Sequence, residues 1–134
     1  MSRLLRWTAV LSCSAALALV GCGDDDDDGP GDGNEVACPP AGTALTEQNF
    51  GRPFLDAYCT RCHASTRTGA ARNGAPPGLD WDQLAVVRAN AARINEAAGA
   101  QADGSVNQEM PPNDPRPMDA ERRNLAEWLA CGAP

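Results

Sequence analysis

The stretch "YCTRCHAS", Tyr58 to Ser65, carries two cysteines three positions apart, followed at once by the only histidine of the chain. On an α-helix, positions i, i+3 and i+4 share one face, so Cys59, Cys62 and His63 can point the same way. Three kinds of site use such residues: a zinc site, a redox dithiol and a covalent haem attachment. The rest of the chain decides between them.

The zinc and dithiol interpretations fit the chain poorly. A structural zinc ion takes four ligands, and no second closely spaced Cys pair or His exists to complete the set. Neighbouring Cys62 and His63 are also awkward ligands for one tetrahedral ion. A thioredoxin-like dithiol opens a helix after a strand, whereas here an apolar helical stripe precedes the motif. We therefore expect neither.

The spacing Cys-x-x-Cys-His is the attachment signature of c-type haem. Cys59 and Cys62 would bond the two vinyl groups on one side of the porphyrin, and His63 would turn its imidazole toward the iron. We therefore expect one covalent haem c, with His63 as an axial metal ligand.

The chain has no other His and no Lys to serve as the second axial ligand, and Met110 and Met118 are the thioether candidates. Met110 stands in "NQEMPPND", where Pro111 disfavours a helix, so its side chain can project from a loop. Met118 precedes a predicted helix cap, Asp119, and should pack back onto that helix as a staple. We expect Met110 to bind the iron; an iron that is pentacoordinate or bound by another ligand is the alternative.

The first 22 residues have the pattern of an export signal: a short basic start, an apolar run and small residues at the end. Their last four, "LVGC", resemble the lipobox of bacterial lipoproteins, which implies cleavage after residue 21 and lipidation of Cys22. Ordinary secretion with cleavage elsewhere is the alternative. Gly23 rather than Asp after the cysteine favours the outer membrane in that resemblance.

Residues 22–45 contain an Asp, Gly and Pro tract and a Pro-rich lead-in, and the tract predicts a solvated tether to a domain at 46–134. Six of the 18 acidic residues lie in this tract. From Glu35 onward the chain has 12 acidic residues and nine arginines, and no basic patch argues for nucleic-acid binding. The net charge of this part of the chain is too small to indicate a class of partner.

Three helices joined by long loops are expected, and no strand. The first has Phe50, Phe54 and Tyr58 at a spacing of four, with Thr46 or Asn49 as its N-cap. The second runs from Asp80, which forms a capping box with Gln83, to Gly99 along a stripe of apolar residues. The third has Asp119 as its N-cap and buries Leu125, Trp128 and Leu129. Such long loops are unusual without a cofactor to surround.

From Thr46 to Pro134 the chain resembles the small class I cytochromes c, on the residues "YCTRCH", "MPP" at 110–112 and the closing helix with "WLACGAP". The resemblance implies an all-α cytochrome c-like fold wrapped around the haem. It also implies that the carbonyl of Pro76, or failing that Ala75, accepts a hydrogen bond from His63. The first helix should cross the last, with Phe54 and Trp128 in contact.

Cys38 and Cys131 depart from the plainest members of that family. Free thiols are unusual in an exported protein, and closing so long a loop would remove roughly 4 to 5 kcal/mol of unfolded-chain entropy. We expect a disulfide between them; two buried free thiols are the alternative.

These features predict a monomeric, membrane-anchored periplasmic electron carrier that is not an enzyme. It would exchange single electrons with redox partner proteins, contact the membrane only through its lipid, and bind no nucleic acid. A haem-based sensor or a peroxidase-like haem protein with a displaceable sixth ligand is the alternative from another class. A structural lipoprotein without haem is the third possibility.

Overall fold

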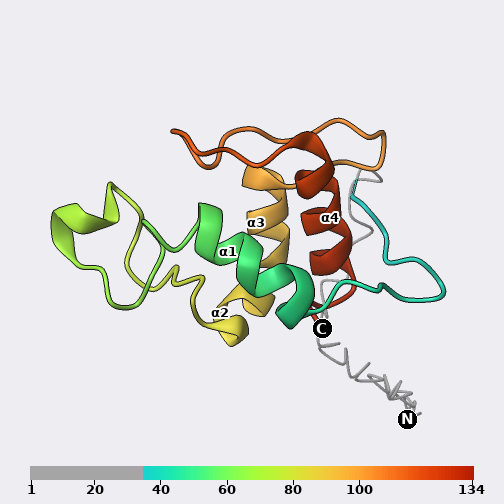
Figure 1. Ribbon diagram of the computed structural model, residues 1–134, viewed down its shortest axis with the longest axis horizontal. Helices are drawn as coiled ribbons and strands as arrows, with labels where there is room; N and C mark the ends of the chain where they lie inside the picture. Colours follow the sequence, from blue (N-terminus) through green and yellow to red (C-terminus); the bar gives the residue numbers. More distant parts are fainter. Residues whose placement is uncertain (1–34) are drawn as a thin grey trace, which may run out of the picture.

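The computed structural model describes residues 35–134 (Figure 1). The predicted signal peptide 1–21, Cys22 and the acidic run lie outside the described residues. The elements are η1 (Glu47–Gly51, a π-helix), α1 (Arg52–Tyr58), η2 (Gly69–Arg72, a 3₁₀ turn), α2 (Leu84–Ala89), α3 (Ala91–Ala98) and α4 (Asp119–Ala130). Between residues 35 and 134 there are two isolated β-bridges and no strand. The all-α class is confirmed.

None of the helices in this described part is long and apolar enough to cross a membrane.

The first helical segment begins where the sequence predicts it. Thr46 is the N-cap: its Oγ1 accepts from the Asn49 N–H at 3.1 Å, and Asn49 Oδ1 accepts from the Thr46 N–H at 2.7 Å. This reciprocal pair satisfies donors that a helix start leaves unpaired. Element η1 continues directly into α1, and Pro53 lies in the first turn of α1.

The predicted aromatic stripe forms along η1 and α1. The ring centroids of Phe50 and Phe54 lie 5.4 Å apart, and those of Phe54 and Tyr58 lie 5.0 Å apart. The Tyr58 hydroxyl also donates to the carboxylate of Glu121 in α4, at 3.1 Å. Helix α1 therefore ends at Tyr58, held against α4, immediately before Cys59.

The prediction of one helix from Asp80 to Gly99 is wrong, because the helix starts later and is broken in the middle. Helix α2 begins after Gln83 and ends at Ala89; the next residue, Asn90, has φ −124° and ψ 23° and precedes α3. The Asn90 side chain donates to the Val86 carbonyl at 2.9 Å, the local competition that makes Asn unfavourable inside helices. Gly99 ends α3, as predicted.

Helix α4 begins one residue earlier than expected, with Met118 rather than Asp119 at its N-cap. The Glu121 carboxylate accepts from the Met118 N–H at 2.8 Å. The prediction that Met118 packs as a staple is wrong, because its side chain is 70% exposed.

Trp128 lies at the centre of the core and is fully buried. Leu125 and Leu129 of α4 are buried beside it, as predicted. We expected Phe54 to meet Trp128; Phe54 belongs to the same core cluster, but the ring that meets Trp128 edge-on is Phe50, with centroids 6.2 Å apart. Helices α3 and α4 stand side by side (Figure 1).

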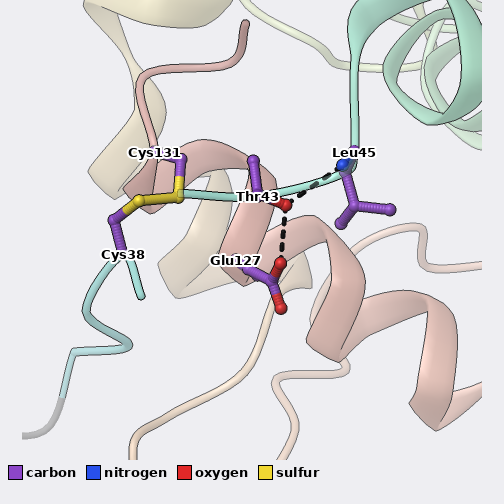
Figure 2. The surroundings of a disulfide bond; sticks show 5 residues. All are labelled: Cys38, Thr43, Leu45, Glu127 and Cys131. Carbon is purple, nitrogen blue, oxygen red and sulfur yellow. Dashed lines mark hydrogen bonds between the residues drawn. A yellow bond between two sulfur atoms is a disulfide. The ribbon is translucent and has the colours of Figure 1, made fainter. Parts of the chain in front are cut away.

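The lead-in is fastened to α4 by two kinds of bond (Figure 2). Cys38 and Cys131, 93 positions apart, form a disulfide, with their Cα atoms 4.8 Å apart. Beside it, Thr43 Oγ1 donates to Glu127 Oε1 at 2.6 Å and accepts from the Leu45 N–H at 3.1 Å. Together these bonds hold the segment before Thr46 on the last helix.

Candidate functional site

A cavity of about 680 Å³ opens among the end of α1, the loop that follows it, α3 and the loop before α4. Its volume lies in the range of small-molecule and cofactor sites. All five residues predicted to bind the cofactor line it: Cys59, Cys62, His63, Pro76 and Met110. Much of the remaining wall is apolar and includes Phe54, Leu79, Trp81 and Ile94. The fold therefore brings the Cys-x-x-Cys-His motif and the Met110 loop to one space.

The motif continues the turn of α1. The Cys59 N–H donates to the Leu55 carbonyl at 2.8 Å, and the Cys59 carbonyl accepts from the N–H groups of Cys62 at 3.1 Å and His63 at 2.9 Å. These bonds fix the three residues of the motif relative to one another. Their side chains all reach the cavity, as the i, i+3, i+4 spacing predicts.

The imidazole of His63 is held by one main-chain oxygen. Its Nδ1 lies 3.0 Å from the Leu79 carbonyl oxygen. Because a carbonyl can only accept, this contact places the proton on Nδ1 and leaves the lone pair of Nε2 free for a metal. Burial is the largest influence on the pKa of His63 and lowers it, which favours the neutral ring that a metal requires.

The prediction that Pro76, or Ala75 in its place, accepts from His63 is wrong. The acceptor is Leu79, three residues beyond Pro76. The Pro76 carbonyl instead accepts from Arg72 Nη2 at 2.7 Å, and the Ala75 carbonyl accepts from Arg72 Nε at 3.0 Å. Pro76 still lines the cavity, so it remains a candidate for contact with a bound group.

Trp81 restricts the orientation of the His63 ring by stacking against its face. The indole stacks on the imidazole with centroids 5.2 Å apart and planes 22° apart, and the Trp81 N–H donates to the His63 carbonyl at 2.8 Å. Sequence reasoning missed this residue because it placed "DWDQ" in the first turn of a helix. The late start of α2 leaves Trp81 in the loop instead.

Arg72 organises the loop between His63 and Trp81. Its guanidinium is buried and bonds to several main-chain carbonyls, including Ala64 at 3.0 Å and Leu79 at 3.2 Å. Asp80 supplies the counter-charge at 2.8 Å, so it serves as the partner of Arg72 rather than in a capping box. Nothing in the sequence pattern distinguished Arg72 from a solvated arginine.

The two motif cysteines are unpaired thiols in the structure. Burial raises the pKa of Cys59 to about 12, so the thiol is neutral at pH 7, unlike the low-pKa cysteine of a reactive dithiol. Within residues 35–134, no three His, Cys, Asp or Glu side chains gather as a metal-binding group. This arrangement gives no support to the zinc interpretation or to the dithiol interpretation.

Met110 reaches the cavity from the loop between α3 and α4, and its side chain is 37% exposed. Met118 does not line the cavity. Arg61, between the two cysteines, donates to the carbonyls of Asp114 at 2.6 Å and Pro115 at 3.2 Å, which ties this loop to the motif.

The residues present fit a covalent haem. Two thiols for the vinyl groups, one imidazole with a free Nε2, one thioether and apolar walls all meet at a single cavity. An imidazole and a thioether are the protein donors that a His/Met-ligated haem iron would use.

In comparisons with protein-family models, curated proteins and solved structures, no match to this chain is found.

Proposed function

We propose that residues 46–134 form a small cytochrome c domain that binds one haem c covalently and carries one electron at a time. The observation that supports this most directly is the shared cavity, which joins the Cys-x-x-Cys-His motif to Met110. The motif predicts the attachment, and the cavity supplies the space and the second axial donor.

The two cysteines, the histidine and the methionine of the cavity have distinct roles in this proposal. The haem supplies an iron that alternates between ferric and ferrous. Cys59 and Cys62 would hold the group by thioether bonds, and His63 would offer the lone pair of Nε2 while Leu79 keeps the proton on Nδ1. Met110 would offer its thioether as a second donor to the iron, which would exclude a substrate and favour the ferrous state.

The same proposal places the domain on the periplasmic side of a bacterial membrane, with the outer membrane favoured. The lipobox-like residues ending at Cys22 and the acidic tract after them support a lipid anchor and a solvated tether. A tethered monomer could exchange electrons with redox partner proteins without any further contact with the membrane.

One observation favours a second candidate, a sensor or peroxidase-like haem protein. Met110 stands in a loop and not on a helix, so a small molecule could replace it on the iron. In that case the iron would bind a ligand instead of only passing electrons.

Carbon monoxide separates the two candidates. A carrier with a permanent Met110 ligand should titrate reversibly with one electron, and its reduced spectrum should not change when carbon monoxide is added. A rapid spectral shift would support the sensor and contradict the carrier.

A further inference from the structure

Arg122 of α4 is a buried arginine that donates only to main-chain oxygens. Its residue is 1% exposed, and Nη1 lies 2.8 Å from the Ala98 carbonyl, 2.6 Å from that of Asn107 and 2.9 Å from that of Met110. One acceptor is the last residue of α3, and the other two belong to the loop that follows. A single side chain thus joins α4, α3 and the loop that carries Met110.

No carboxylate forms a direct ion pair with this guanidinium among residues 35–134, although Asp119 and Glu121 lie near enough to favour its charged form. The ion pairs of residues 35–134 are Arg52 with Glu47 and Arg72 with Asp80, and neither includes Arg122. Burying an ion without a counter-ion costs several kcal/mol, offset only by strong hydrogen bonds. The two N–H groups of Nη1 are shared among the three carbonyls, and two of these carbonyls belong to the loop before α4.

The main chain of Met110 is consequently held on both sides. Its N–H donates to the Ala97 carbonyl at 2.8 Å, and its carbonyl accepts from Arg122. Ala97 and Ala98 both line the cavity. Because the backbone is fixed to the end of α3, the side chain of Met110 can change its position only by changing its rotamer.

We propose that Arg122 is the positioning residue of Met110: it holds the 107–110 loop on α3 so that the thioether stays at the cavity. The inference rests on the proposed haem function. It explains how the thioether stays at the cavity, since the restraint acts on the main chain of Met110, which bonds to Ala97 and to Arg122.

The test compares Arg122→Lys and Arg122→Gln with the wild type, all loaded with haem. Lysine keeps the charge but shortens the reach to the Met110 carbonyl, and glutamine also removes the charge. The matched controls are Arg123→Lys and Arg123→Gln, since the neighbouring Arg123 is exposed and bonds only to the Gly104 carbonyl, at 3.2 and 3.3 Å. The readouts are the far-red sulfur-to-ferric-iron band, carbon monoxide binding when reduced, and exchange of the Met110 N–H.

The lysine variant should weaken the far-red band and the glutamine variant should lose it. Both should begin to bind carbon monoxide, and the Met110 N–H should exchange roughly tenfold faster or more, as expected when a hydrogen bond to a charged group is removed. A purely structural role would lower the unfolding temperature but leave the band and the carbon monoxide exclusion of the folded protein unchanged.

Arg122 variants that match the Arg123 controls in all three readouts would overturn this inference and leave the cytochrome proposal intact. If Arg122→Gln does not fold, Arg122→Lys alone is compared with its control Arg123→Lys, by the same three readouts. A wild type without haem, or without the far-red band, overturns both proposals together.

Discussion

The main chain of Gly51 lies directly on the indole of Trp128. A Cβ atom built on Gly51 would come 2.6 Å from Trp128 Cη2 and nearer still to Cζ2. Such distances are far below van der Waals contact, and the obstacle is a fully buried ring that cannot swing aside. Glycine is therefore required where η1 crosses α4, and this crossing sets the position of α1 and of the motif at its end.

Gly51→Ala should destabilise the fold. Adding one methyl to a packed core costs about 1 to 3 kcal/mol, and here the neighbour is a rigid ring. Chemical denaturation of the haem-loaded protein, monitored by far-ultraviolet circular dichroism, measures the change.

The control for this prediction is the same substitution in a Trp128→Phe background. The smaller ring leaves room for the new methyl, so the added cost of Gly51→Ala should shrink there. An equal cost in both backgrounds would show that the indole is not the obstacle.

The Cys38–Cys131 disulfide should contribute stability without contributing to haem binding. Changing both cysteines to serine should lower the free energy of unfolding by about 2 to 5 kcal/mol, because the bridge closes a long loop in the unfolded chain. The haem spectrum should not change, since neither residue lines the cavity. Free alkylation of both thiols in the unfolded, unreduced protein would refute the bridge.

The helices could be predicted from the sequence wherever local signals decided them. Thr46 and Asn49 form their capping box within one turn, and the buried face of α4 follows from its apolar spacing. The break at Asn90 could not be predicted, because the apolar stripe continues through it and only the side chain's bond to Val86 reveals the competition.

The residues of the candidate site also divide into those that could be predicted from the sequence and those that could not. It could be predicted that Cys59, Cys62 and His63 share one site, because they form a contiguous motif of metal- and haem-binding residue types. The carbonyl that faces His63 could not, because it depends on how Arg72 and Asp80 fold the loop, and Leu79 has no side-chain signal for that role. Arg122 was missed for a similar reason, since its partners are all main-chain oxygens.

Met110→Ala should remove the sixth ligand. A neutral thioether favours ferrous over ferric iron, so the variant should lose the far-red band, fall in reduction potential and bind carbon monoxide when reduced. Met118→Ala is the matched control; with its side chain 70% exposed, it should change none of these properties. If the band disappears in the Met118 variant and persists in the Met110 variant, the two assignments are reversed.

Cys22→Ala should release the protein from the membrane without changing its haem spectrum. The prediction follows from the lipobox-like sequence and from the acidic tract, which lies between Cys22 and the domain in the sequence. Fractionation of cells that express each form measures it. A variant that stays in the membrane pellet would point to a different anchor.

Covalent attachment of one haem at Cys59 and Cys62 is the central claim, and intact mass together with a pyridine haemochrome spectrum tests it most directly. The protein should be produced in a bacterial host competent for c-type maturation, beside a variant with both cysteines changed to alanine. The account predicts the mass of one added haem on the wild type, retained in acid and organic solvent, and none on the variant. A wild-type chain with both cysteines unmodified would contradict the account.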